Sequence, residues 1–161
     1  MQPPPVTANV RVRRAELSDL DDLAKLEQGT FDSDRMTRAQ YRRHLDSASA
    51  LVLVASANHR RFLGTAVVFF RKRSRVARLY SLASHPAGRG QGIGTALVEA
   101  AEAAARRRRC RAMRLEVRCD NHRAMALYER QGYRRIGSLA KYYEDDADGF
   151  RYEKVLGQEV S

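Results

Sequence analysis

The order of apolar and polar residues predicts several β-strands in the first half of the chain. Residues 10–15 alternate apolar and basic side chains, as an edge strand or a half-buried strand does. Residues 50–56 form a continuous apolar run, and two more strand-like runs follow at residues 64–73 and 75–84. A turn around residues 58–60 separates the first two of these three runs, which together predict an antiparallel meander.

Apolar residues at helical spacing mark the segments between and after these strands. Leucines at this spacing predict a first helix, which we expect to be capped by Ser18 or Asp19 and to end at Gly29. A second, short helix follows Thr37. A third helix is predicted over residues 91–107, where apolar residues recur three and four positions apart.

The last third of the chain adds a strand, a helix and two further strands. Residues 112–118 alternate apolar and charged side chains, so the charged ones share one face of a strand. Asn121 is a good cap for the helix that follows, and Gly132 suits its end. Residues 133–143 and 150–156 predict two strands joined by an acidic loop. This order of elements is typical of an α+β domain with a mixed sheet.

The length of 161 residues fits one domain with a sizeable core. We assign residues 1–9 to a short extended tail and residues 10–161 to that domain. No signal peptide and no apolar run near the roughly 20 residues of a membrane span is present, so we expect a cytoplasmic protein without a membrane partner. Cys110 and Cys119 are then free thiols, and because neither they nor the four scattered histidines have metal-ligand spacing, no metal site is predicted.

The net charge of +11 favours an anionic partner, such as a nucleic acid or a phosphorylated cofactor, although it can also serve solubility alone. The densest basic run is Arg106–Arg111. Cations suit the carboxyl end of a helix, and the run has no interleaved aromatic residues for base stacking. Nucleic acid is therefore not the expected partner, and the role of the run stays open.

Three glycines in five positions, Gly90, Gly92 and Gly94, lie between the strand at 75–84 and the next predicted helix. The unpaired N–H groups at a helix start bind anions, and glycine lets phosphate oxygens approach the backbone. The spacing does not fit the dinucleotide fingerprint, and no lysine is present to complete a P-loop. The loop is thus either a flexible turn or a phosphate site of another kind.

A third phosphate pattern does fit, because Arg89–Gly94 matches Arg/Gln-x-x-Gly-x-Gly/Ala. This segment resembles the acetyl-CoA signature of the GNAT acyltransferase superfamily, and the resemblance extends from about Val10 to Leu156. It is strongest for the ribosomal-protein alanine N-acetyltransferases, which have a Leu-Glu-Val-Arg strand, an Asn, an Ala-Leu-Tyr-Glu helix, and a Tyr-Tyr near an Asp-Gly turn. Here these are Leu115–Arg118, Asn121, Ala126–Glu129, Tyr142–Tyr143 and Asp148–Gly149.

The resemblance implies a mixed, mostly antiparallel sheet of about seven strands, flanked by about four helices, with strands four and five splayed apart. It also implies acetyl-CoA as the donor. Its pyrophosphate would bind the N–H groups of the glycine loop, and its pantetheine arm would lie along the fourth strand, where an N–H near Leu82 would polarise the thioester carbonyl. The implied cofactor-binding residues are Leu82, Ala83, Ser84, Arg89, Gly90, Gln91, Gly92, Ile93, Gly94, Thr95 and Asn121, the last of which can also merely cap its helix.

The same resemblance implies two catalytic residues. Glu116 would be the base, because an α-amine with a pKa of about 8 is largely protonated at neutral pH and must lose a proton before it attacks. Its action could be direct or through water, and the alternative is an ion pair with Arg114 or Arg118. Tyr128 would donate a proton or a hydrogen bond to the departing CoA thiolate, and the alternative is a buried aromatic residue.

The acceptor is expected on the side of the acidic loop at residues 144–149, with Tyr142 and Tyr143 as the walls of its entrance, unless this loop is only a solvated hairpin tip. The expected function is acetyl transfer to a protein or peptide α-amine, by direct attack in a ternary complex. The alternatives are an acetyltransferase for a small amine, such as a polyamine or an aminoglycoside, and a non-catalytic module that binds acyl-CoA or nucleic acid. Either a monomer or a homodimer is compatible with the sequence.

Overall fold

The computed structural model describes residues 9–31 and 35–157 of the chain, so the predicted tail lies almost entirely outside the described residues. Seven strands form one sheet in the order β1-β2-β3-β4-β5-β7-β6, and every neighbouring pair is antiparallel except β4 and β5, which are parallel. The predicted α+β class and the mixed, mostly antiparallel sheet are confirmed.

The bounds of the elements are close to those predicted. The strands are β1 (Arg11–Arg14), β2 (Ala50–Ala57), β3 (Arg60–Phe70), β4 (Val76–Ser84), β5 (Ala112–Arg118), β6 (Arg134–Leu139) and β7 (Gly149–Val155). The helices are α1 (Leu20–Thr30), α2 (Arg38–Leu45), α3 (Ile93–Arg107) and α4 (His122–Arg130), with short 3₁₀ turns η1 (Leu17–Asp19) and η2 (Pro86–Gly88).

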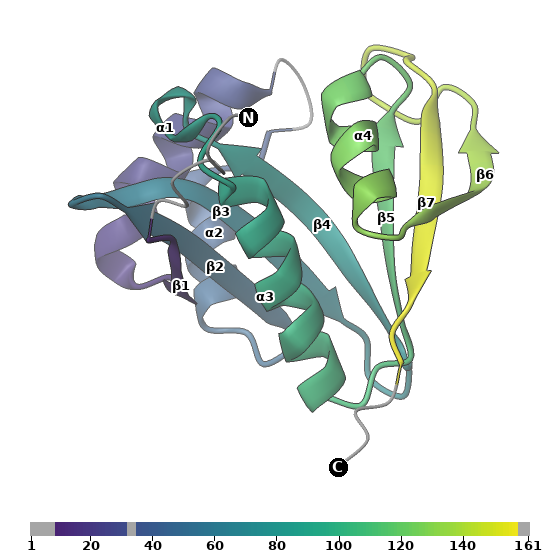
Figure 1. Ribbon diagram of the computed structural model, residues 1–161, viewed down its shortest axis with the longest axis horizontal. Coiled ribbons are helices and arrows are strands. Elements are labelled where there is room, and N and C mark those ends of the chain that lie inside the picture. The colour runs from purple at the N-terminus through teal and green to yellow at the C-terminus, as the bar shows by residue number, and fades with distance from the viewer. Residues whose placement is uncertain (1–8, 32–34, 158–161) are drawn as a thin grey trace, which may run out of the picture.

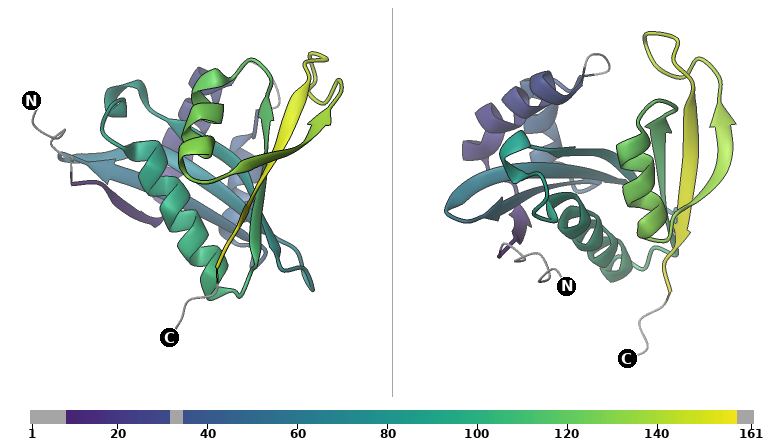
Figure 2. Two further views of the ribbon diagram at one scale, coloured as in Figure 1. Left: turned by 45° about the vertical axis from the view of Figure 1, so that its right-hand side comes forward. Right: turned by 45° about the horizontal axis from the view of Figure 1, so that its top comes forward.

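The continuous apolar run of β2 follows from its place in the middle of three layers. Leu51 and Leu53 pack in the cluster that contains the buried face of α3, whereas Val52 and Val54 pack in a second cluster with α1 and α2. Successive side chains of a strand point to opposite faces, so a strand covered on both faces is apolar at every position. Figure 2 shows α3 on one face of this part of the sheet and α1 and α2 on the other.

The parallel strands β4 and β5 diverge after a short paired stretch, as predicted. Only three residue pairs join them, and Arg78 paired with Arg114 is the last. In the same region β4 has a bulge, because Leu79 and Ser81 pair with consecutive residues of β3 and leave Tyr80 unpaired. Beyond this point the sheet opens into two arms, one ending in β4 and the other formed by β5, β7 and β6 (Figure 1).

Several predicted boundaries were wrong for local physical reasons. Gly29 lies inside the last turn of α1, which continues to Thr30. Asp19 occupies the N-cap position of α1, as predicted, but its side chain does not cap the helix, because the carboxylate instead accepts hydrogen bonds from Arg13 and from the backbone N–H of Glu16. An ion pair with a cation from β1 has thus replaced the expected local cap.

Two strand ends also differ from the predictions. β3 begins at Arg60 rather than residue 64, because the turn before it contains only Asn58 and His59, both with positive φ. β6 ends at Leu139, so Tyr142 and Tyr143 lie in the loop before β7 and not in a strand. Since this loop is free of the sheet, its two tyrosines can face the gap between the arms.

Candidate functional site

A cleft of about 780 Å³ opens where β4 and β5 separate. Its walls come from five parts of the fold: the end of α1, the splayed part of β4, the end of β5, the start and middle of α4, and the loop between β6 and β7. The lining residues that matter below are Glu27, Arg78, Ser81, Leu82, Glu116, Asn121, Tyr128, Tyr142 and Tyr143. All four predicted catalytic and acceptor-side residues, Glu116, Tyr128, Tyr142 and Tyr143, therefore line one cavity.

The glycine loop forms the start of α3, as predicted. Gly90 and Gly92 have φ values of 78° and 77°, a conformation that side chains disfavour, and a Cβ added at either would point into open space. Among the described residues, the N–H groups of Gly92 to Thr95 have no backbone acceptor, as expected for the first turn of a helix. Together with the helix dipole, these N–H groups suit a pyrophosphate.

The side chains around this loop hold it in place. Gln91 accepts a hydrogen bond from Asn58 and donates one to the carbonyl of Ala87. Ile93 is buried in the core, so only its backbone can serve an anion. A Cβ on Gly94 would lie 3.0 Å from Leu127 Cδ2, so this glycine lets α3 and α4 approach closely. Two side-chain hydrogen bonds of Gln91 and the packing of Ile93 thus anchor the loop to its neighbours.

The three predicted residues of β4 differ in their surroundings. Leu82 lines the cleft, whereas Ser84 lines a second cavity of about 440 Å³ together with Arg89 and residues of α1. Ala83, between them, is buried and lines neither cavity, as the alternation of a strand requires. If Ala83 contacts a cofactor, it can do so only through its backbone.

Ser81 is a site residue that the sequence did not indicate. Its hydroxyl is the one buried side-chain polar atom without a hydrogen-bond partner in the described part of the chain, and the residue lines the cleft. Buried polar groups are nearly always paired, so this hydroxyl is suited to a polar atom of a bound ligand. The unpaired hydroxyl, the two open edges of β4 and β5, and the uncapped α3 together fit a phosphorylated molecule with an extended amide-containing arm.

Glu116 is held by two arginines from neighbouring strands. Arg78 Nε donates to Oε2 at 3.0 Å and Arg151 Nη2 donates to Oε1 at 3.4 Å, and the Glu116 side chain is 9% exposed. The predicted alternative of a pair with Arg114 or Arg118 was wrong. Arg114 pairs with Glu153, and Arg118 forms hydrogen bonds with Asp120 and Asp145. Glu116 thus pairs with arginines of the neighbouring strands β4 and β7 and not with the arginines of its own strand.

Tyr128 lies on the inner face of α4, where it is 6% exposed and lines the cleft. Its ring packs edge to face against that of Tyr133, with centroids 5.8 Å apart. Burial raises the pKa of the Tyr128 phenol, because the phenolate would lose its solvation. The hydroxyl is therefore protonated at neutral pH and available as a donor.

Asn121 caps α4, since its Oδ1 accepts a hydrogen bond from the N–H of Ala124 at 3.1 Å. The same residue lines the cleft, so the capping role and a contact with a ligand are compatible. The cap engages only the oxygen of the side-chain amide, and the NH₂ group is a separate donor.

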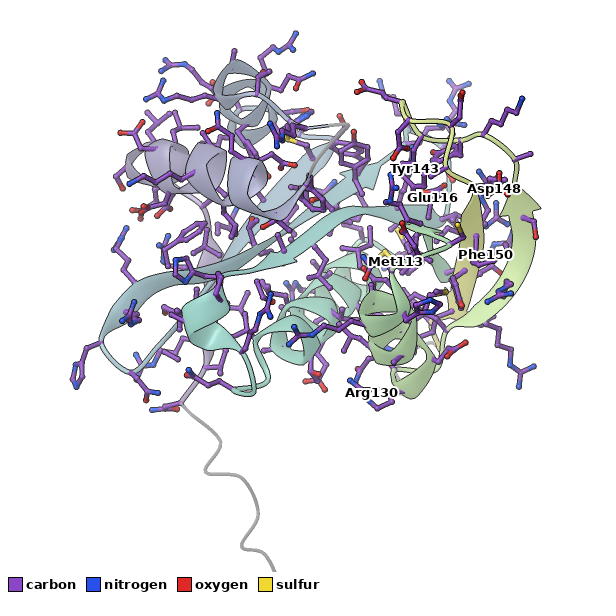
Figure 3. All side chains as sticks on the ribbon, turned by 90° about the horizontal axis from the view of Figure 1, so that it is seen from above. Met113, Glu116, Arg130, Tyr143, Asp148 and Phe150 are labelled. Atoms are coloured by element: carbon purple, nitrogen blue, oxygen red, sulfur yellow. The ribbon has the colours of Figure 1, made fainter. Side chains whose placement is uncertain are left out.

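The loop between β6 and β7 closes the cleft on the side of β5. Tyr142 accepts a hydrogen bond from Arg78 Nη2 at 2.9 Å, which joins the loop to β4, and its ring lies at 90° to that of Tyr143. Arg118 contacts Asp145 through two hydrogen bonds, so part of the acidic charge of the loop is balanced. Figure 3 shows Glu116 and Tyr143 on the same side of the cleft.

A sequence profile of the acetyltransferase (GNAT) family matches residues 17–133, from η1 to just after α4. The chain therefore belongs to the GNAT acetyltransferase family and is an acyltransferase. None of its described helices is long and apolar enough to cross a membrane.

Two curated relatives point to N-acetylation. The chain is 28% identical over 139 residues to a putative [ribosomal protein bS18]-alanine N-acetyltransferase of Bacillus subtilis, which covers 85% of this chain and 89% of the relative. It is 42% identical over 64 residues to N-alpha-acetyltransferase 30 of Schizosaccharomyces pombe. The aligned region covers 40% of this chain and 43% of the yeast protein.

Solved structures show the same fold in enzymes for different acceptors. The ribosomal-protein-S18-alanine N-acetyltransferase of Escherichia coli superimposes with a TM-score of 0.79 at 22% identity, over 94% of this chain and 99% of that chain. A mutant of the spermidine N-acetyltransferase of Vibrio cholerae gives a TM-score of 0.80 at 17% identity, over 91% of this chain and 94% of that chain. At these identities the likeness extends to the fold alone.

Proposed function

We propose that this N-acetyltransferase takes its acetyl group from acetyl-CoA and transfers it to the α-amine of a protein or peptide. The observation that carries the proposal is the cleft between the splayed strands. Backbone donors for a pyrophosphate lie at the start of α3, and Glu116 and Tyr128 line the cleft itself. Donor and acceptor can therefore be bound together, which favours direct transfer in a ternary complex.

The donor side is built from backbone groups and a few side chains. The N–H groups of Gly92 to Thr95 bind the pyrophosphate, and Arg89, which is exposed, adds positive charge near them. The arm of the cofactor would lie along the open edge of β4 at Leu82 and beside Ser81, both of which line the cleft. The thioester of acetyl-CoA would supply the activated acetyl group, and a β4 N–H near Leu82 would stabilise negative charge on its carbonyl oxygen.

Glu116 acts on the acceptor amine, and Tyr128 acts on the departing sulfur. Glu116 accepts a proton from the acceptor amine, directly or through a water, since each of its paired oxygens retains a second lone pair. Tyr128 donates a hydrogen bond toward the departing sulfur, because burial raises the pKa of its phenol, which keeps the proton on the phenol oxygen and opposes its full transfer to the thiolate. Arg78 and Arg151 orient the Glu116 carboxylate and do not themselves take part in proton transfer.

The acceptor side of the cleft suits the amino terminus of a protein or peptide. The loop with Tyr142 and Tyr143 covers the cleft beside Glu116, and aromatic walls of this kind suit an extended peptide whose terminal amine enters first. Names of the relatives in Bacillus subtilis and Schizosaccharomyces pombe, which describe alanine and α-amine acetylation, support the same class of acceptor.

A small polyamine is the second candidate acceptor, and one observation favours it. Four acidic residues line the cleft, against two arginines: Glu27, Glu116, Asp120 and Asp145, with Arg78 and Arg118. A surplus of carboxylates attracts a molecule with several positive charges. The fold is also that of a spermidine N-acetyltransferase.

Mass spectrometry separates the two candidates. The protein is incubated with acetyl-CoA and either peptides that differ in their first residue or spermidine and spermine. We expect acetylation of one or more peptides at the α-amine, and little acetylation of the polyamines. Acetylated polyamine beside unmodified peptides would reverse the assignment, and failure to bind acetyl-CoA at all would refute the proposed function.

A further inference from the structure

Glu27 is a buried carboxylate that lines the cleft and has no part in the reaction described above. It lies on α1, and the residue is 4% exposed. The Tyr41 hydroxyl donates to its Oε1 at 2.6 Å. This neutral donor fixes the position of the carboxylate but brings no positive charge to it.

Glu102 is a second buried glutamate, with a structural role only, and it provides a comparison for Glu27. It is 2% exposed and accepts a hydrogen bond from the Tyr133 hydroxyl at 2.9 Å, so its surroundings parallel those of Glu27. In addition, Lys154 Nζ lies 2.8 Å and Arg106 Nη2 3.9 Å from its Oε1. A buried carboxylate is costly without a cationic partner, and Glu102 has two.

Glu27 has no such cation, since no ion pair within 4.0 Å joins it to any described residue. Arg35 is the cation whose charge acts on Glu27, but its Nε donates to the carbonyl oxygen of Phe31. Burial raises the pKa of the Glu27 carboxyl because these partners do not offset its lost solvation. The missing counter-charge can come from the cleft that Glu27 lines.

The other glutamate in the cleft lining cannot fill that role. Both oxygens of Glu116 are already paired with arginines, so its negative charge is balanced from within the protein. An acceptor amine with a pKa of about 8 arrives mostly as an ammonium ion at pH 7, with three donors and one positive charge. Asp120 and Asp145 are paired with Arg118, so of the four carboxylates in the cleft lining only Glu27 lacks an ion pair within 4.0 Å with a described residue.

We infer that Glu27 is the anionic subsite that binds the ammonium group of the acceptor on the α1 side of the cleft. This inference rests on the proposed function and deepens it. Glu27 attracts and positions the cationic form of the amine, and Glu116 receives the proton when the amine becomes the nucleophile. The two glutamates therefore divide between them the tasks of binding and deprotonation.

Calorimetry on the CoA-loaded protein tests this subsite without turnover. The probes are an alanine-starting hexapeptide that contains no lysine or arginine, and its des-amino analogue, in which hydrogen replaces the α-amine. We expect the wild type to bind the amine form about tenfold more tightly than the analogue, as one close charge pair provides. Glu27→Gln, which keeps an oxygen for Tyr41 but removes the charge, should reduce this preference to nearly one and leave the affinity for CoA unchanged.

Two matched variants separate this role from a structural one. Glu102→Gln changes the other buried glutamate beside a tyrosine and should retain the full preference for the amine. Tyr41→Phe removes the hydrogen-bond donor but leaves the Glu27 carboxylate, and it should retain most of the preference. Spermidine serves as a second probe, whose affinity should also fall about tenfold in Glu27→Gln.

The inference is overturned if Glu27→Gln keeps the preference for the amine form and binds spermidine as the wild type does. It is also overturned if the wild type itself does not distinguish the two peptides and does not bind spermidine. If the wild type acetylates peptides but Glu27→Gln retains the preference for the amine form, the subsite is refuted and the proposed function stands. A protein that neither binds acetyl-CoA nor acetylates any amine would refute the proposed function instead.

Discussion

Arg78 Nε donates to Glu116 Oε2 at 3.0 Å, and this ion pair joins the two arms of the sheet just where they separate. Arg78 is in the last residue pair between β4 and β5, and Glu116 lies two residues beyond its partner, Arg114. The same guanidinium donates to the Tyr142 hydroxyl at 2.9 Å. One arginine therefore orients both the proposed base and a wall of the acceptor entrance.

Replacement of the proposed base should slow the reaction without emptying the donor site. We expect Glu116→Gln to lower kcat about 100-fold, because the amine loses its proton acceptor in the transition state. The affinity for acetyl-CoA should change less than twofold. Steady-state kinetics and calorimetry measure the two quantities.

Glu153→Gln is the matched control, since it also removes the partner of an arginine, Arg114, but lies outside the cleft lining. It should leave kcat unchanged. Equal loss of kcat in both variants would mean that Glu116 matters only as a structural ion pair.

The phenol of Tyr128 should contribute to turnover and not to packing. Tyr128→Phe keeps the ring and its contact with Tyr133, and we expect kcat to fall at least tenfold with little change in the affinity for acetyl-CoA. Tyr133→Phe removes a neighbouring hydroxyl that is bonded to Glu102, so it should lower thermal stability and leave kcat nearly intact. Normal turnover in Tyr128→Phe would remove this residue from the mechanism.

A substitution in the glycine loop should weaken the binding of the donor, acetyl-CoA. In Gly92→Ala the added methyl group strains a residue with φ of 77° by about 1–2 kcal/mol and points into the open space that a phosphate would occupy. We expect the dissociation constant of acetyl-CoA to rise at least tenfold. Gly137→Ala is the control, because its Cβ also meets nothing within 4 Å but lies in β6, outside the lining of both cavities, and it should leave donor binding unaffected.

The pair of Arg13 and Asp19 should make stability depend on pH. The Arg13 guanidinium holds the pKa of Asp19 below its ordinary value, so the native state binds fewer protons here than the unfolded chain does. This stabilisation is complete above the unfolded pKa of about 4 and disappears as the pH falls through the lower native value.

Asp19→Asn should therefore lower the free energy of unfolding at pH 7 by about 2–3 kcal/mol, and by much less near pH 3. Urea denaturation at the two pH values measures both differences. Asp21→Asn, which breaks an exposed pair with Arg38, should have little effect at either pH. A loss for Asp19→Asn that does not depend on pH would contradict the assigned ion pair.

The fold was predictable because its signals are local. The apolar run of β2, the Asn121 cap and the positive φ of Gly132 all act within a few residues, and each was found where the pattern placed it. The splayed strands were predicted from the resemblance of the flanking motifs and not from any local signal. The bulge at Tyr80 has no local signal either, so Ser81 was missed.

The partners of the site residues were not predictable, since they depend on strand register. Arg78 and Arg151 are 38 and 35 residues away from Glu116, and only the folded sheet brings them to it. Glu27 did carry a signal that was overlooked. It follows Leu20 by seven positions and Leu23 by four, which places a charged residue on the buried face of α1.

The most direct test of the account is to follow the acetyl group itself. The protein is mixed with isotopically labelled acetyl-CoA, first alone and then with an acceptor peptide, and both protein and peptide are analysed by intact mass spectrometry. Direct transfer predicts an unmodified protein at every time point and the label on the α-amine of the peptide. Label that accumulates on the protein before the peptide is added, or a peptide that never gains it, would contradict the account.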